Sequence, residues 1–243
     1  ALIISVASVQ AQKSQVIAHR GYWKTAGSAQ NSITSLQKAD SIHCYGSEFD
    51  VWLAKDNKLV VNHDPVYKMK YMEYSKGDAL TGLKLSNGEN LPSLQKYLEA
   101  GKKCNTKLIL ELKAHNSKKR ETKAVQEILA MVKKMGLEDR MEYITFSLHA
   151  MKEFIRLAPA GTPVFYLNGE LSPKELKDLG AAGLDYHMGV IKKHPEWIKE
   201  AHDLGLKVNV WTVDKAEDMK WLIDQKVDFI TTNEPIVAQD MLK

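Results

Sequence analysis

Three short segments in the first quarter of the chain gather side chains suited to acid–base and metal chemistry. They are His19-Arg20-Gly21, Glu48-Phe49-Asp50 and His63-Asp64, and each lies at or beside a short apolar run typical of a β-strand. Together they supply two imidazoles, three carboxylates and one guanidinium. This set can hold a divalent cation, bind an anionic group and move protons on either side of it.

The spacing of the two carboxylates in the second segment indicates that they act together. Glu48 and Asp50 are two residues apart on a predicted strand, so they point to the same face and repel each other unless a cation lies between them. A polar turn at Asp56-Asn57 predicts a hairpin that places Asp50 roughly opposite His63. The apolar neighbours of the aspartate argue against the alternative, in which both carboxylates face water on an exposed strand.

Strand-like and helix-like segments alternate along the chain, and the pattern predicts an α/β fold. Counted with the hairpin as one, there are eight main strands, which favours a (β/α)8 TIM barrel over a doubly wound sheet. Polar residues gather at the carboxyl ends of these strands, where barrel active sites lie, and no Gly-rich dinucleotide fingerprint supports the alternative. The barrel should carry a β-hairpin and a short irregular insertion, over residues 65–92, after the second strand. Helices are expected over residues 31–43, 92–100, 122–135, 150–157, 173–179, 195–204, 216–225 and 235–242.

Composition and charge are those of an ordinary globular protein. The 243 residues are 44% hydrophobic and 26% charged, which is enough for one large core and a single domain over residues 12–243. The formal charge of +4 is scattered, and no basic stripe or known motif indicates a nucleic-acid partner. The cysteines, Cys44 and Cys104, form no disulfide framework, and whether they pair is left open. The oligomeric state is also left open.

The first residues resemble the end of an export signal. An apolar run over residues 1–9 is followed by Gln10-Ala11-Gln12, which suits a small-residue cleavage site at Ala11. The run is too short to span a bilayer, so no stable membrane insertion is expected. We expect residues 1–11 to be the remnant of a secretory signal peptide and the protein to be periplasmic or secreted. The alternative is that residues 1–9 form an extra helix or strand at the bottom of the barrel.

Further motifs follow the first three segments in a recognisable order. The complete series is His19-Arg20-Gly21, Glu48-Phe49-Asp50, His63-Asp64, Glu111-Leu112-Lys113, Trp211-Thr212 and Thr232-Asn233-Glu234-Pro235. Through this series the chain resembles the glycerophosphodiester phosphodiesterase family over nearly its whole length after the leader. Each motif alone is a weak signal, whereas all of them in order at strand ends are specific.

The resemblance implies a reaction and assigns residues to it. Glu48, Asp50 and Glu111 would bind one divalent cation, Ca²⁺ or Mg²⁺, because oxygen ligands suit a hard cation better than zinc. His19 and His63 would be the general acid and the general base, and which residue takes which role stays open. The reaction would be the hydrolysis of a glycerophosphodiester, a small-molecule substrate, to an alcohol and glycerol 3-phosphate.

Other residues would bind the substrate. Arg20 and Lys113 would hold the phosphate, and Trp211 would either stack on the glycerol or head group or pack as plain core. Gln30 stands where the family often has a carboxylate, which would leave the metal site with one negative charge fewer. Asn31 would either line the site or only cap the following helix.

Two other functions remain open at this point. The first is phospholipase C-like or lysophospholipase D-like cleavage of a lipid phosphodiester through a cyclic phosphate. That reaction needs an exposed apolar rim, which a loop after His63 could supply unless its side chains pack as a hydrophobic plug: Tyr67, Met69, Tyr71, Met72 and Tyr74. The second is non-catalytic binding of a phosphate ligand, which the full set of reactive groups argues against.

Overall fold

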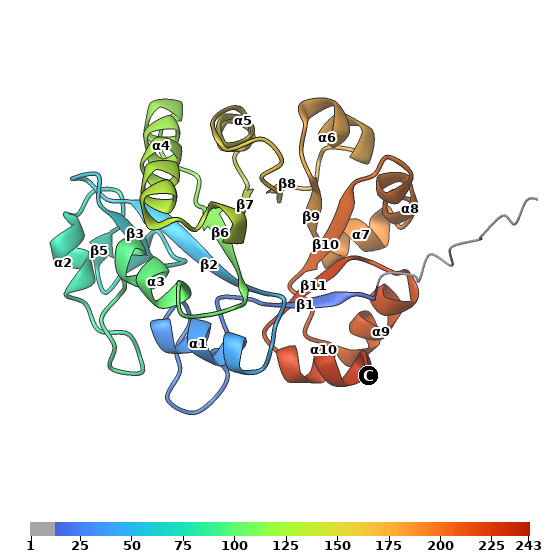
Figure 1. The fold of residues 1–243 in the computed structure, drawn as a ribbon, viewed down its shortest axis with the longest axis horizontal. Coiled ribbons are helices and arrows are strands. Elements are labelled where there is room, and N and C mark those ends of the chain that lie inside the picture. Colours follow the sequence, from blue (N-terminus) through green and yellow to red (C-terminus); the bar gives the residue numbers. More distant parts are fainter. Residues whose placement is uncertain (1–12) are drawn as a thin grey trace, which may run out of the picture.

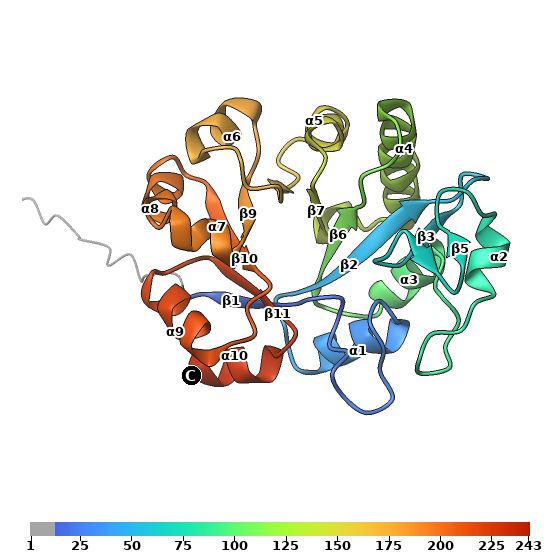
Figure 2. The same ribbon diagram turned by 180° about the vertical axis from the view of Figure 1, so that it is seen from behind.

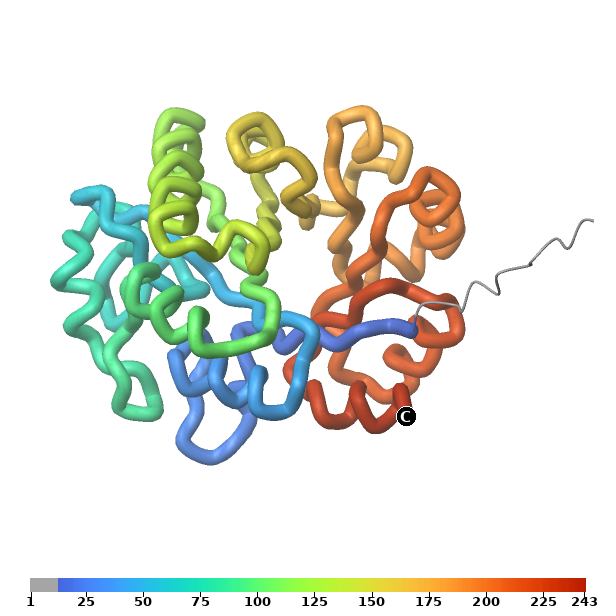
Figure 3. Tube along the Cα trace, in the orientation of Figure 1, coloured from blue at the N-terminus to red at the C-terminus, as the bar shows by residue number. Residues whose placement is uncertain are grey.

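The computed structural model describes residues 13–243 and shows a closed barrel. Within these residues, eight parallel strands pair in the order β1-β11-β10-β9-β8-β7-β6-β2, and β1 also pairs with β2, so the sheet closes on itself (Figures 1 and 3). The predicted (β/α)8 TIM barrel is therefore confirmed. The strands are β1 (Gln15–Ala18), β2 (Gly46–Leu53), β6 (Lys107–Leu112), β7 (Met141–Thr145), β8 (Val164–Tyr166), β9 (Gly183–His187), β10 (Lys207–Trp211) and β11 (Phe229–Thr232).

Helices form an outer ring around the strands (Figures 1 and 2). The ring helices are α1 (Ile33–Ser41), α3 (Leu94–Gly101), α4 (Lys118–Met135), α5 (Leu148–Leu157), α6 (Pro173–Leu179), α8 (Glu196–Asp203), α9 (Ala216–Asp224) and α10 (Pro235–Met241). Helix α4 begins four residues before the predicted Thr122, because the Ser117 side chain accepts a hydrogen bond from Arg120 N and caps the helix there. A short helix α7 (Met188–Lys193) and a 3₁₀ turn over Glu138–Arg140 were not predicted.

The predicted hairpin is present, with a register one residue away from the prediction. Strand β3 (Leu59–Val61) pairs antiparallel with β2, and Val51 faces Val61. Asn62 N donates to Asp50 O at 3.0 Å, so Asn62 rather than His63 lies opposite Asp50. The turn sets this register, because Ala54 N donates a hydrogen bond to Lys58 O and so closes the loop between these two residues.

The insertion after β3 is more ordered than predicted. It contains a small hairpin of β4 (Val66–Tyr67) and β5 (Lys70–Tyr71), followed by helix α2 (Gly77–Thr81), at the left edge of Figure 1. Met72 is fully buried in the same apolar cluster as Trp52, as a plug would be, whereas Met69 is 94% exposed. Tyr71 and Tyr74 are exposed as well, so one part of the predicted set packs as a hydrophobic plug and another part forms an exposed rim.

The barrel interior holds apolar and polar side chains in layers. Its apolar residues are Ile17, Ile109, Ile144, Phe165, Leu167 and Phe229. Among the polar ones, Glu142 accepts a hydrogen bond from Tyr45 Oη, and Asn209 accepts one from Thr231 Oγ1. Both cysteines among the described residues are buried and free, which answers the open question of their pairing. No helix within residues 13–243 is long and apolar enough to cross a membrane. The signal-peptide prediction for residues 1–11 lies outside the described residues.

A half-buried histidine joins the ends of β2 and β6. His115 Nε2 accepts a hydrogen bond from Leu53 N at 2.9 Å, and its Nδ1–H donates to Lys113 O at 2.6 Å. The ring is neutral, because an imidazolium has no nitrogen lone pair with which to accept. Burial is the main reason that the pKa of His115 falls from 6.5 to about 4.

This histidine gives the first prediction, on stability. The unfolded chain takes up a proton on His115 at a higher pH than the folded protein does, so stability falls as the pH drops from 6.5 to about 4. At most about 3 kcal/mol is lost in this way. We expect His115→Leu to lower the free energy of unfolding at pH 7 by about 1–3 kcal/mol. We also expect a shallower loss than wild type in that pH window, measured by urea unfolding with EDTA. Equal slopes for both proteins would contradict the prediction.

Candidate active site

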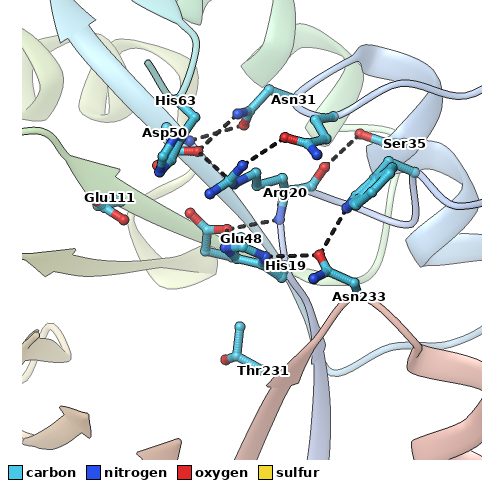
Figure 4. A network of polar contacts seen from close by, with 12 residues as sticks. His19, Arg20, Asn31, Ser35, Glu48, Asp50, His63, Glu111, Thr231 and Asn233 are labelled. Carbon is cyan, nitrogen blue, oxygen red and sulfur yellow. Dashed lines mark hydrogen bonds and ion pairs between the residues drawn. The ribbon is translucent and has the colours of Figure 1, made fainter. Parts of the chain in front are cut away.

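A cavity of about 170 Å³ lies at the carboxyl ends of the barrel strands. The side chains singled out in the sequence meet there, and Figure 4 shows several of them facing one another. The cavity is lined by His19, Arg20, Glu48, His63, Glu111, Ile144, Phe146, Leu167, Asp185, Trp211, Thr212 and Thr231. Of the predicted site residues, Asp50 and Lys113 lie directly behind this lining, in contact with each other and with Glu111 or Arg20.

The three predicted metal ligands form one cluster. Glu48 and Asp50 lie on β2 and Glu111 lies on β6, where it pairs in register with Asp50. All three are buried, and one oxygen from each lies within 4.8 Å of the others. Burial, with the charge of Asp50 second, raises the pKa of Glu48 well above its ordinary value and that of Glu111 to about 7.

Two basic side chains offset the charge of this cluster. Lys113 Nζ lies 2.8 Å from Glu111 Oε1 and 3.3 Å from Asp50 Oδ1. Arg20 Nε lies 3.8 Å from Asp50 Oδ2. Burial alone would raise the pKa of Asp50, but the positive charge of Lys113 and the other cations hold it below its ordinary value. Asp50 is therefore the member of the cluster that ionises most readily.

A hard cation fits the residues present. The donors are carboxylate oxygens only, which suit Ca²⁺ or Mg²⁺. Glu48 Oε2 accepts a hydrogen bond from Arg20 N at 2.8 Å, whereas Glu48 Oε1 is buried and has no hydrogen-bond partner among the described residues. A buried carboxylate oxygen without a partner is costly, and a bound cation would satisfy it.

The residues around Arg20 hold the first motif in place. Arg20 and Gly21 both have positive φ, at 57° and 76°, and a Cβ on Gly21 would lie 2.3 Å from Ser35 Oγ, so only glycine fits there. Gln30 Oε1 accepts a hydrogen bond from Arg20 Nη1 at 2.7 Å. Gln30 therefore orients the guanidinium.

Asn31 lines the site instead of capping the helix. Its Nδ2 donates to Asp50 Oδ2 at 2.9 Å, and its Oδ1 accepts from Asp50 N at 3.1 Å. The capping role belongs to Ser32, whose hydroxyl accepts a hydrogen bond from Ser35 N. This settles the two alternatives left open by the sequence.

The hydrogen bonds behind His19 fix its tautomer. Asn233 Nδ2 donates to Asp214 Oδ2 at 2.8 Å, which turns Asn233 Oδ1 toward His19 Nδ1 at 2.9 Å (Figure 4). Because that oxygen can only accept, the proton of the neutral ring is on Nδ1. His19 Nε2 then carries the lone pair on the side of Glu48, whose Oε2 lies 4.0 Å away. Burial, with the charge of Arg20 second, lowers the pKa of His19 to about 4.

His63 lies between two cavities. It lines the inner cavity and also an outer groove of about 450 Å³, whose wall includes Trp23, Lys24 and Tyr67. Its Nδ1 lies 2.7 Å from Asp64 Oδ1, so the neutral ring donates from Nδ1 to that carboxylate. Burial is the main cause of the lowered pKa of His63, and the nearby charges of Asp50 and Lys113 act in opposite directions.

Comparison with known proteins identifies the family. Residues 19–237 match the Glycerophosphoryl diester phosphodiesterase family. The chain belongs to this family. It is 27% identical to a glycerophosphodiester phosphodiesterase of Caldanaerobacter subterraneus subsp. tengcongensis, over 92% of this chain and 95% of that protein. The crystal structure of a glycerophosphodiester phosphodiesterase from Parabacteroides distasonis is 52% identical, with a TM-score of 0.93 over 95% of this chain and 97% of that one. A phosphodiesterase from Oleispira antarctica, solved with the product sn-glycerol-3-phosphate, shares the fold at 22% identity and a TM-score of 0.80, over 94% and 96% of the chains.

In this family member several site residues escaped the sequence reasoning. Asn233 and Asp214 orient His19, and Trp23 Nε1 donates to the same Asn233 oxygen at 3.0 Å. Asn233 belongs to the Thr232-Asn233-Glu234-Pro235 motif, and its position just after β11 could have indicated that it lies at the active-site end of the barrel. Asp214 follows β10 by three residues and lies two residues after the Trp211-Thr212 motif, which did not include it. Trp211, predicted as stacking residue or core, lines the cavity and packs edge-to-face on Phe146.

The tautomer of His19 can be tested directly. The hydrogen bond from His19 to Asn233 raises the His19 pKa, so its loss in Asn233→Ala should move that pKa further below about 4. The variant should also show His19 protonated on Nε2 in part of the molecules, because Nδ1–H loses its acceptor. ¹⁵N NMR of imidazole-labelled, metal-free protein measures both. Asn168→Ala, at an exposed asparagine bonded to Glu170, should leave the His19 signals unchanged. A wild-type ring already protonated on Nε2 would contradict the prediction.

Proposed function

We propose that this enzyme hydrolyses glycerophosphodiesters to an alcohol and glycerol 3-phosphate with a Ca²⁺ or Mg²⁺ ion held by Glu48, Asp50 and Glu111. The observation that carries the proposal is one cavity lined by two members of a three-carboxylate cluster and by two histidines. Family membership supports the reaction class, and the product bound in the Oleispira antarctica protein supports the identity of the phosphorylated product.

The charged residues divide the binding of the phosphate among them. A bound cation would offset negative charge that develops on the phosphate oxygens. Arg20 would bind the phosphate through its guanidinium, which Gln30 orients from the other side. Lys113, whose Nζ contacts both Glu111 and Asp50, would act as a point charge on the phosphate.

The hydrogen bonds of the two histidines suggest their roles. His19 Nε2 carries a free lone pair, so His19 would accept the proton of the attacking water as general base. The Asp64 carboxylate would stabilise a protonated His63, which would donate its Nε2 proton to the departing alcohol oxygen. His63 also borders the outer groove, through which the alcohol would leave.

Hydrolysis assays with defined substrates test this proposal. Glycerophosphocholine, glycerophosphoethanolamine and glycerophosphoinositol would be incubated with the purified enzyme in EDTA and then with Ca²⁺ or Mg²⁺ restored. Metal-dependent release of glycerol 3-phosphate, observed by ³¹P NMR, is the expected result. Full activity in excess EDTA would contradict the metal role, and no turnover with any metal would contradict the proposed substrate.

Lipid cleavage is the second candidate, because of the exposed side chains after His63. Met69, Tyr71 and Tyr74 are exposed on the insertion that follows His63-Asp64, which is where an apolar rim would contact a lipid chain. Lysophosphatidylcholine in the same assay discriminates, since faster turnover than glycerophosphocholine or a cyclic phosphate product would favour this candidate. Export to the periplasm or beyond is also proposed, on residues 1–11 alone.

A further inference from the structure

One buried carboxyl group in the cavity has no part in the mechanism described above. Asp185 lies on β9, is 2% exposed and lines the inner cavity. Its Oδ1 is buried and has no hydrogen-bond partner among the described residues. A buried carboxyl oxygen left without a partner costs free energy, so a group from a ligand should complete its hydrogen bonds. The neighbouring strand β10 contacts the backbone of this residue, because Trp211 Nε1 donates to the main-chain oxygen Asp185 O at 2.9 Å.

The chemistry around Asp185 indicates the kind of ligand group. Burial, followed by the charges of Glu111 and Glu142, raises the pKa of Asp185 well above its ordinary value. In either protonation state the carboxyl group can accept a hydrogen bond from an alcohol hydroxyl, and in the neutral state it can also donate one. The phosphate has better partners in Arg20 and Lys113. A quaternary ammonium head group has no N–H or O–H with which to satisfy the free oxygen.

The size and position of the cavities agree with a hydroxylated ligand at this place. The inner cavity measures about 170 Å³, which is roughly the liquid volume of five or six water molecules. It suits a small polyol, and the hydroxyl-bearing Thr212 and Thr231 line it together with Asp185. The outer groove of about 450 Å³ meets it at His63 and leaves room for a larger head group.

We propose that Asp185 binds a hydroxyl group of the glycerol moiety and thereby places the glycerol in the inner cavity and the head group in the outer groove. The proposal rests on the proposed function, because it assumes that the phosphate lies between the carboxylate cluster and the two histidines. It makes Asp185 a determinant of specificity for a glycerol over other alcohols.

Binding without turnover gives the first test. The affinities of sn-glycerol 3-phosphate and of inorganic phosphate would be measured by calorimetry with Ca²⁺ present. Asp185→Leu, which keeps the branched shape of the side chain and removes its polar atoms, should weaken the binding of glycerol 3-phosphate about 10- to 100-fold and that of inorganic phosphate less than about threefold. Asp185→Asn keeps a donor and an acceptor and should retain most of the affinity. An equal loss of affinity for both ligands, or no loss of affinity for either, would overturn the proposal.

Turnover gives the second test. Asp185→Leu should lower kcat/KM for glycerophosphocholine about 10- to 100-fold and leave that for bis(4-nitrophenyl) phosphate, which has no glycerol, nearly unchanged. Glu121→Gln is the matched control, a second buried carboxyl that does not line the cavity. This control should leave kcat/KM unchanged for both substrates. Equal losses on both substrates in Asp185→Leu would show a structural role and overturn the proposal.

The two proposals fail in different ways. If wild type binds glycerol 3-phosphate but cleaves no glycerophosphodiester, the proposed function fails, and selective loss of that ligand in Asp185→Leu still supports the role of Asp185. If wild type cleaves glycerophosphocholine and Asp185→Leu does so equally well, the proposed function stands and the role of Asp185 is overturned. A lowered Ca²⁺ affinity in Asp185→Leu would place this carboxyl in the metal site and also overturn the role.

Discussion

His19→Ala should lower kcat for glycerophosphocholine by about 10²–10⁴-fold, the range that a general base contributes. His63→Ala should cause a loss of similar size on this substrate, because choline is a poor leaving group that needs a proton. The two variants should differ on a 4-nitrophenyl diester, whose leaving group departs without protonation. There His63→Ala should recover most of the wild-type rate, and His19→Ala should stay slow because the attacking water still needs its base.

The measurement is kcat for both substrates at saturating Ca²⁺, with stabilisation by Ca²⁺ as a check that the carboxylate cluster is intact. His194→Ala is the control, because His194 is only half-buried and stacks on Trp197 outside the cavity. Its rates should equal those of the wild type. Recovery in His19→Ala instead of His63→Ala would reverse the roles derived from the hydrogen bonds to Asn233 and Asp64.

The parts of the site that follow from local geometry were predictable from the sequence. Side chains alternate between the two faces of β2, so Glu48 and Asp50 lie on the same face. The strand ends of a barrel meet at one rim, so Glu111 on β6 joins them there. The barrel itself follows from the alternation of strands and helices. The ends of individual helices were less certain, because a single cap such as Ser117 moves a boundary by a full turn.

The second layer of the site could not be predicted, because it depends on contacts between distant segments. Asn233 reaches His19 across 214 residues, and no local pattern indicates which polar side chain at a strand end turns inward. Asp185 illustrates the same limit, since its importance lies in a missing partner, which only the packed barrel shows. The hairpin register differs by one residue for a related reason, because the turn hydrogen bonds and not the apolar pattern fix it.

Substitution within the carboxylate cluster should have the other large effect, which combines a change in stability with a loss of the response to Ca²⁺. In wild type, Ca²⁺ at about 100 times its Kd should raise the free energy of unfolding by about 2.7 kcal/mol. Glu111→Gln removes one charged ligand, so nearly all of this increase should disappear at the same concentration, and metal-dependent turnover with it. Thermal and urea unfolding with and without Ca²⁺ measure the response. Glu142→Gln should keep the full response, because Glu142 bonds to Tyr45 and lies outside the cluster.

Without metal the same substitution should act in the opposite direction above neutral pH. The pKa of Glu111 is raised from 4.5 to about 7, mainly by burial, so the folded protein holds a proton that the unfolded chain has lost. Stability from this proton is present below pH 4.5 and is lost as the pH rises through about 7. A glutamine has no proton to lose, so Glu111→Gln in EDTA should gain about 1–3 kcal/mol relative to wild type between pH 5 and pH 8. A variant that becomes relatively less stable over that range, or that keeps the full Ca²⁺ response, would show that Glu111 is not a charged member of a cation site.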